Sequence, residues 1–297
     1  MLKKFELQLF AAETNTTVKD DLEPAISIDC VSKINGNIDE LREVLGISEM
    51  EAMAAGTSIK VWKMEQVNTP AQVGEGETIN LTKVERKLAK TIDLELKKYR
   101  RNTTAEAIQK VGRDIAINKT DEKLISGIQK EIKKDFYAVL GTGSGEAHGT
   151  TLQATLSATW GAIKKFYEDE DATPIYFVSS EDVAEYLGTA QVTLQQAFGM
   201  SYIKDFLGLG TVVVSPALEK GKVIGTAKEN LHGAYIPTNS GDVARTFGLT
   251  SDATGLVGMT HQTVSENATV DTLVFSGVVF YPEMLNGVIV GTIGTGA

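Results

Sequence analysis

A long run of alternating polar and apolar residues stands out in the first half of the chain. From Val84 to Lys98 the even positions are mostly apolar, whereas most odd positions are charged. This period of two is typical of a strand with one buried face, and it predicts about 15 residues where 5–6 are usual. A strand over 57–67 and a turn-rich tip at 68–78 precede it. The pattern therefore predicts a long two-stranded ribbon, which is marginal in water unless its apolar face finds a partner surface.

A change of period after the ribbon predicts a long helix. Thr103 and Glu106 have the spacing of a capping box. Apolar residues then recur every three or four positions as far as Ala138, so one helix of about 35 residues is expected, with an interruption near Asn118 left open. The mean helix has about 11–12 residues, and no heptad repeat supports a coiled coil. The helix is therefore expected to lie as a spine across a sheet.

The segment before the ribbon and the C-terminal half are patterned differently. Residues 12–35 are polar and acidic and are expected to form an extended arm, followed by a short helix within 36–55 that ends at Gly46. Residues 141–151 (GTGSGEAHGTT) are expected to form a loop. The other expected elements alternate as in an α/β or α+β domain. They are helices at 152–168 and from a Ser179 or Ser180 cap to Leu187, short helical pieces at 194–198 and 203–207, and strands at 175–179, 211–215, 222–227, 234–238, 269–281 and 287–293.

The charge of the chain is unevenly distributed. The net charge is −10, yet residues 83–134 hold 15 lysines and arginines against 8 acidic residues. Residues 12–55 hold 10 acidic residues against 3 basic ones. Two parts of the same chain or of neighbouring chains would attract one another with this distribution, and two solvated faces are the alternative interpretation. Tyr99 is the one aromatic residue of the basic segment, too few for a platform on which nucleic-acid bases stack.

The cysteine count and the apolar runs indicate the cellular compartment in which the chain is expected. Cys30 is the only cysteine, which excludes an intrachain disulfide and a cysteine-based zinc site, and it is expected to be a small buried or interface hydrophobe. The longest apolar run, 272–291, is broken by Pro282 and Glu283 and is expected to form strands rather than a membrane span. At the N-terminus, Glu6 interrupts the short apolar patch, which therefore does not match the apolar region of a signal peptide. A cytoplasm-like compartment is the expectation.

None of the chemical motifs is complete. The Gly-rich loop at 141–151 lacks the frame of a phosphate-binding loop, and Ser144 lacks that of a nucleophile elbow. The acidic run 168–171 lacks the spacing of a calcium loop and is expected to be a solvated helix exit. The histidines have no metal-ligand spacing; they are His148, His232 and His261. We therefore expect no catalytic residue, no cofactor, no metal site and no enzymatic activity.

Several short motifs occur in an order that resembles one family. They are the opening Glu6–Ala11 (ELQLFA), the tip Ala71–Glu77 (AQVGEGE), the basic strand Lys83–Lys90 (KVERKLAK) that runs directly into a long helix, and Phe280–Val290 (FYPEMLNGVIV) late in the chain. Their order along the whole chain resembles that of the major capsid proteins of tailed bacteriophages, whose shell fold is also found in encapsulins. Each motif is weakly specific by itself, so the order carries the resemblance.

The resemblance implies a fold and its subdivisions. The expected class is α+β, the phage major capsid fold of the Hong Kong ninety-seven type. In that family an extended loop lies over the adjacent subunit, which would supply the partner surface that the ribbon needs. The expected parts are an N-terminal arm at 1–56, an extended β-hairpin loop at 57–102, a peripheral domain with the spine helix at 103–149 and 241–297, and an axial domain at 150–240.

The resemblance also implies a structural function. Copies of the chain are expected to assemble into hexamers and pentamers of an icosahedral phage head, first in the host cytoplasm and finally in the virion. Scaffolding and portal proteins are the expected partners, and double-stranded DNA is enclosed without sequence-specific binding and without a membrane. The acidic surface outside residues 83–134 would keep DNA from adhering to the wall. The alternatives are an encapsulin-like compartment, a metal-dependent enzyme that uses 168–171 and a histidine, and a phage adhesin or decoration protein.

Overall fold

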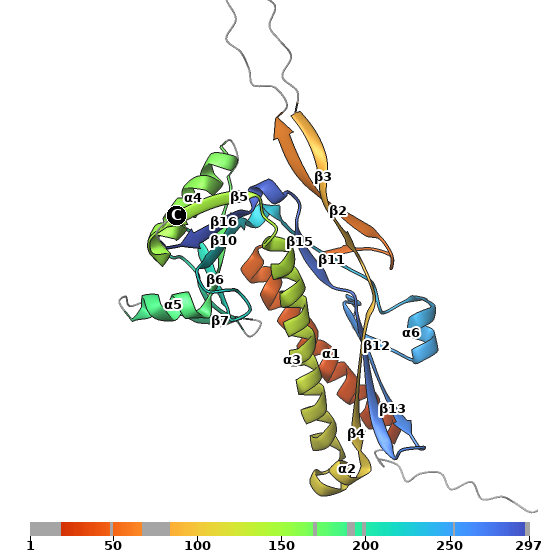
Figure 1. Cartoon of the computed structure of the whole chain (residues 1–297). Coiled ribbons are helices and arrows are strands. Elements are labelled where there is room, and N and C mark those ends of the chain that lie inside the picture. The colour runs from red at the N-terminus through yellow and green to blue at the C-terminus, as the bar shows by residue number, and fades with distance from the viewer. Residues whose placement is uncertain are drawn as a thin grey trace, which may run out of the picture.

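Two long helices, α1 (Lys19–Leu45) and α3 (Arg113–Leu140), run through the molecule and share a core with three β-sheets (Figure 1). The computed structural model describes residues 19–47, 50–66, 84–168, 171–188, 194–197, 200–251 and 253–294. The N-terminal ELQLFA motif and the 68–78 tip lie outside these ranges. Cys30 lies within α1, but its side chain is not among those described. The shorter helices are α2 (Ala105–Val111), α4 (Leu152–Phe166), α5 (Ser180–Leu187) and α6 (Gly241–Phe247).

Helix α1 corrects the prediction of an extended arm at 12–35. From residue 19 onward the segment is helical, and the helix ends at Leu45, just before Gly46 with φ 76°, where the sequence placed its end. Val31, Ile34 and Ile38 are almost fully buried. They continue the three-to-four spacing of the predicted short helix toward the N-terminus, across Gly36. This short apolar stripe is hard to recognise in the sequence because acidic residues dominate the composition of 12–35.

The long helix is divided, but not where the sequence suggested. Gly112 has φ 89° and separates α2 from α3, so the break lies several residues before Asn118. Glycine adopts this backbone conformation without the penalty that a Cβ would bring. The N-cap of α2 is Thr104 rather than Thr103: its hydroxyl accepts a hydrogen bond from the backbone N–H of Ala107 at 3.3 Å.

The long alternating strip is also divided. It forms β3 (Val84–Asp93) and β4 (Lys97–Thr104), which belong to different sheets. β3 pairs with β2 (Ser58–Gln66) as an antiparallel ribbon, whereas β4 pairs with β14 (Thr269–Ser276). Leu94 lies between the two strands and is fully buried, and its N–H donates to the carbonyl of Thr57 at 2.9 Å. This anchor ends the ribbon, so the single strand of about 15 residues that the period predicted does not form.

A four-stranded antiparallel sheet packs against the lower parts of α1 and α3 in Figure 1. Its order is β12-β13-β14-β4. The sequence did not predict β12 (Thr250–Ser251) or β13 (Val257–Val264). The strand expected at 269–281 is two strands, because β15 (Val279–Pro282) leaves this sheet. It joins a three-stranded sheet of order β1-β11-β15, with β1 (Met50–Ala52) and β11 (Leu231–Tyr235).

A seven-stranded mixed sheet forms the other part of the molecule. Its order is β5-β16-β10-β6-β9-β8-β7. β5 (Gly145–Gly149) lies in the segment expected to be a loop and pairs in parallel with β16 (Ile289–Ile293). The predicted axial segment 150–240 therefore shares its sheet with strands from outside it. The inner strands β6 (Pro174–Ser179), β9 (Thr211–Ser215) and β10 (Lys222–Ala227) match their predictions.

The short strands at the end of this sheet replace predicted helical pieces. β7 (Gln195–Ala197) and β8 (Met200–Ile203) are antiparallel neighbours, so the expected helix at 194–198 is wrong. Residues 204–207 form turns rather than a helix. β8 pairs with β9, and this pairing supplies the backbone hydrogen bonds that a helix would have made within the segment. In short segments such tertiary pairing can outweigh the local preference for a helix.

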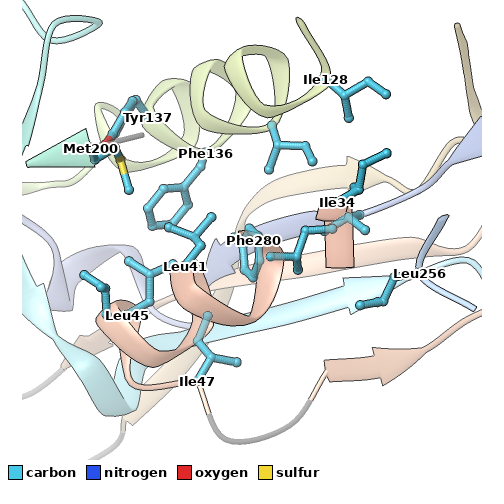
Figure 2. Close-up of a cluster of buried hydrophobic side chains, with 14 of the residues drawn as sticks. Ile34, Leu41, Leu45, Ile47, Ile128, Phe136, Tyr137, Met200, Leu256 and Phe280 are labelled. Carbon is cyan, nitrogen blue, oxygen red and sulfur yellow. Dashed lines mark hydrogen bonds between the residues drawn. The ribbon is translucent and has the colours of Figure 1, made fainter. Parts of the chain in front are cut away.

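Each face of the seven-stranded sheet is covered. Along β6, Tyr176 and Val178 pack under α4, whereas Ile175 and Phe177 contribute to the core around α1 and α3. Phe177 meets Phe136 of α3 edge-on at a ring distance of 5.4 Å, and Figure 2 shows Phe136 among the buried side chains of α1 and β15. Burial on both faces explains the continuous apolar sequence of β6. On the α4 side, a Cβ at Gly225 would lie 2.4 Å from the Thr159 methyl group, so close packing of α4 requires glycine there.

Candidate assembly surface

The ribbon of β2 and β3 projects from the body of the molecule (Figure 1). Its base is held by the segment that follows β15. The backbone N–H of Trp62 donates to the carbonyl of Glu283 at 3.0 Å, and Trp62 forms an isolated β-bridge with Met284. Arg86 pairs with the Glu283 carboxylate at 2.9 Å and lies over the Trp62 ring at 4.8 Å. These contacts fix the direction in which the ribbon leaves the body.

A bulge in the ribbon divides its faces differently from the sequence prediction. The pairing register shifts between Val61 and Trp62, so Lys90 is opposite Val61 and Leu88 is opposite Trp62. Consecutive residues of a strand point to opposite faces, so Leu88 and Lys90 lie on opposite faces although both are even-numbered. Near the base, Ile59 and Val61 are buried, whereas Leu88 is 51% exposed. The described ribbon is thus in contact with the body as far out as Arg86, and the Leu88 side chain, opposite Trp62, is left half exposed.

Further exposed apolar side chains lie on separate parts of the surface. Val111 and Ile115 flank the Gly112 break and are 41% and 53% exposed. The other large ones are on α4, on α6 and in turns, and they are Trp160, Phe166, Leu194, Leu207, Val243 and Phe247. Scattered single residues of this kind are normal on a monomer. Their presence around the molecule is compatible with contacts on several sides but does not by itself locate an interface.

A charged clamp joins β4 to helix α3. The Lys97 ammonium donates to the carboxylates of Glu131, at 3.0 Å, and Asp135. Burial lowers the pKa of Lys97, but the bonds to the two carboxylates outweigh it and the pKa is raised. Burial likewise raises the pKa of Glu131, but the hydrogen bond and charge of Lys97 prevail and hold it below its ordinary value. The clamp therefore favours the charged form of both partners.

This clamp predicts a pH-dependent contribution to stability. Since the pKa of Glu131 is lowered on folding, its contribution is complete above the ordinary value of 4.5 and is lost as the pH falls below it. We expect Glu131→Gln to lower the thermal midpoint by about 1–3 °C at pH 7 and by less at pH 4. Calorimetry at both pH values measures this. Glu122→Gln, on the same helix, is the control, and equal effects of Glu131→Gln at the two pH values would contradict the argument.

A buried polar cluster also joins α3 to the four-stranded sheet. Asp121 accepts a hydrogen bond from the Thr272 hydroxyl at 2.9 Å, and its other carboxylate oxygen lies 2.9 Å from Nε2 of His261. The side chains of Asp121 and His261 are 4% and 2% exposed. Their partners compensate for the burial of polar groups, which is costly when they are unpaired. One sequence signal could have revealed the cluster: Asp121 occupies an apolar-spaced position between Ile117 and Leu124.

The other residues considered for chemistry are not brought together. His148 lies in β5, and His232 lies in β11 near Glu283, at 3.5 Å. Within the ranges that the structure describes, no group of three or more His, Cys, Asp or Glu side chains is arranged to hold a metal ion. Ser144 precedes β5, and its N–H donates to the carbonyl of Leu285. Of the acidic run, Glu168 and Asp171 are exposed, and 169–170 lie outside the described residues.

No helix in the described part of the chain is long and apolar enough to cross a membrane.

Comparisons with known proteins give matches in structure. No protein-family model matches the sequence, and no curated protein matches it either. The capsid of an empty GTA particle matches with a TM-score of 0.56 and 10% identity, over 86% of this chain and 90% of that one. The capsid of cyanophage A-1(L) matches with a TM-score of 0.54 and 9% identity, over 86% and 93% of the two chains. The holo-SrpI encapsulin of Synechococcus elongatus PCC 7942 matches at 0.51 and 13%, over 84% and 86%.

The chain has the Hong Kong ninety-seven fold. The resemblance inferred from the order of the motifs is thereby confirmed at the level of the fold. This chain is 9–13% identical in sequence to these phage and encapsulin shell proteins, so what it shares with them is the path of the backbone. Fold alone does not determine function.

Proposed function

We propose that this chain is the major capsid protein of a tailed-phage head and assembles into hexamers and pentamers of an icosahedral shell around double-stranded DNA. The observation that carries the proposal is the projecting ribbon of β2 and β3 on a Hong Kong ninety-seven fold. Leu88 is exposed there, and an isolated ribbon is marginal in water. A second copy would bury this surface. Each buried Å² of apolar surface contributes about 25 cal/mol before the costs of association.

The parts of the fold have proposed roles. The ribbon within 57–102 is the extended loop, although β4 at its end belongs to the four-stranded sheet. α3 is the spine helix of a peripheral domain formed by 103–149 and 241–297. The segment 150–240, with its seven-stranded sheet, is the axial domain that meets its copies around the hexamer and pentamer axes, and β5 and β16 complete that sheet. The N-terminal arm at 1–56 contains α1, which is part of the core.

The proposed partners and location follow from this role. The chain binds copies of itself through heterologous contacts, which close a shell when the rotations between copies close. Scaffolding and portal proteins would guide the assembly in the host cytoplasm, and the mature chain would be part of the virion. The role is structural and requires neither catalysis nor a membrane.

An encapsulin-like compartment is the second candidate. The fold match to an encapsulin supports it. Encapsulins generally begin with a helix, so the extended arm that the sequence predicts at 12–35 would be an argument against a compartment. Helix α1 removes that argument for residues 19–45. The contents of purified particles distinguish the two candidates: nucleic acid indicates a phage head and a protein cargo indicates a compartment.

Negative-stain electron microscopy of the expressed chain tests the proposal. We expect round particles of uniform size, tubes, or rings of five and six subunits. A chain that stays monomeric at every concentration, as judged by sedimentation velocity, would rule out the shell function. It would instead favour an enzyme, whereas a small oligomer without closed particles would favour an adhesin or decoration protein.

A single substitution tests the role of the exposed ribbon residue. We expect Leu88→Asp to reduce the yield of particles by about tenfold or more, since a charge buried at a contact costs several kcal/mol per copy. The thermal midpoint should change little, because Leu88 is half exposed in the monomer. Gln153→Asp, at an exposed position on α4, introduces the same charge away from the ribbon and is the control. Normal particle yield from Leu88→Asp would exclude this side chain from the contact.

A further inference from the structure

A basic hollow lies between β4 and α3, beyond the end of the seam that the Lys97 clamp closes. Its volume is about 780 Å³. The strand and the helix run antiparallel here, since Lys97 meets Glu131 while Thr103 meets Thr120 at 3.1 Å. Thr120 is among the residues that border the hollow. It is lined by Arg100, Arg101, Asn102, Lys119, Thr120, Glu122, Lys123 and Ser126.

The cations of the hollow differ in how they are engaged. Arg100 is tied to the buried carboxylate of Asp271, with its Nε at 2.7 Å from Oδ2. Arg101, Lys119 and Lys123 are exposed and have no ion-pair partner among the described residues. Lys119 and Lys123 are four residues apart on α3 and so are neighbours on one helix face. Glu122 is the one carboxylate among the lining residues, so these three cations leave the hollow with a net positive charge.

The lining has no aliphatic or aromatic side chain. Protein–protein contacts generally have an apolar or aromatic anchor at their centre. Surfaces that bind nucleic acid are more polar and much more basic, and they use Arg, Lys, Ser and Asn to contact phosphate oxygens. Asn102 and Ser126 supply such neutral donors beside the cations. The composition of the hollow thus favours a phosphate backbone over a peptide.

We propose that this hollow binds the phosphate backbone of double-stranded DNA without reading its sequence, an inference that rests on the proposed phage-head function. The chain has a net charge of −10, so most of its surface repels DNA, and the hollow would confine contact to one place per subunit. This refines the expectation that the wall does not bind DNA. The scarcity of aromatic residues in 83–134 excludes base stacking, but contact with phosphates does not require stacking.

The test measures binding of a short random-sequence DNA duplex to the purified full chain over a range of salt concentrations. The variant carries Arg101→Gln, Lys119→Gln and Lys123→Gln. Each phosphate contact contributes about 0.9 to the slope of log affinity against log salt, so we expect the variant's slope to be shallower by about 2.7 and its affinity at 100 mM salt to fall by about a hundredfold. The matched control, Lys33→Gln with Lys165→Gln and Lys204→Gln, removes the same charge from exposed positions elsewhere and should behave like the wild type.

The outcomes separate the hollow from the shell function. Thermal midpoints confirm that both variants fold, and negative-stain microscopy reports assembly independently of DNA binding. Equal slopes for the two variants, or no DNA binding by the wild type, would overturn the proposal even if particles form. If the hollow variant kept its DNA slope but stopped forming particles, the hollow would be a contact for an acidic segment of another copy, and the proposal would again be wrong. Failure of every chain to assemble, with the slopes as expected, would reject the shell function alone.

Discussion

A chain in which residues 67–83 are replaced by Asn-Gly is expected to fold normally and to form no closed particles. Gln66 and Val84 are paired directly across the ribbon, so a two-residue turn can join them without disturbing any described pair. The described core is built without this segment, and we expect the thermal midpoint to stay within about 2 °C of the wild type. The proposed shell, by contrast, should not close, because every copy lacks the segment that joins the two ribbon strands. Sedimentation velocity and negative-stain microscopy measure the result.

The control for this deletion is a chain in which 67–83 is replaced by a Gly/Ser segment of equal length. It restores the number of residues between β2 and β3 but not their side chains, so it shows whether length or chemistry is needed. Particles of normal size and yield from the Asn-Gly chain would be incompatible with a shell held together by the extended loop.

A second large effect is expected from Ile34→Ala in α1. Ile34 is fully buried in the core shared by α1, α3 and both larger sheets, and Figure 2 shows it there. Truncation of such a residue removes buried apolar surface and leaves a cavity, at a cost of about 2–5 kcal/mol. We expect the thermal midpoint to fall by roughly 3–8 °C. Circular dichroism during heating measures the change.

The neighbouring substitution Lys33→Ala is the matched control, since Lys33 is exposed on the same helix. Its effect should stay within about 0.5 kcal/mol. If Ile34→Ala had no larger effect than Lys33→Ala, α1 would not be a core element, and the extended acidic arm that the composition suggested would be the better description.

The sequence predicted those elements whose local pattern agrees with their tertiary surroundings. The runs that became β6, β9 and β10 are almost wholly apolar because both faces of their sheet are covered. The cap of α5 was also predicted: the Ser179 hydroxyl accepts from the N–H of Glu181 at 3.3 Å. In these places a few neighbouring residues carry enough information to define the structure.

Other elements depend on partners that are distant in sequence. β5 lies in a Gly-rich segment that has no strand pattern, and it exists because β16 pairs with it. The division of the alternating strip into β3 and β4 depends on β14. The hydrophobic periodicity of a segment gives no information about such distant partners. Where the segment's own preference for a secondary structure is weak, pairing with those partners determines what it forms.

The candidate surface was predicted only in outline. The period-two pattern indicated a ribbon with an unpartnered face, and the ribbon is present. The bulge that places Leu88 and Lys90 on opposite faces was not foreseen, because a one-residue shift in register leaves no mark on the alternation of a single strand. The contact between Asp121 and His261 joins residues 140 positions apart and could not be read from their spacing.

The position of β16 within its sheet has a consequence for biosynthesis. β16 lies between β5 and β10, so the sheet cannot close while the ribosome is still translating the residues before it. At about 5–20 residues per second, the delay between emergence of β5 and of β16 is on the order of ten seconds. A nascent chain therefore cannot complete this sheet until the residues of β16 have been synthesised and have left the ribosome.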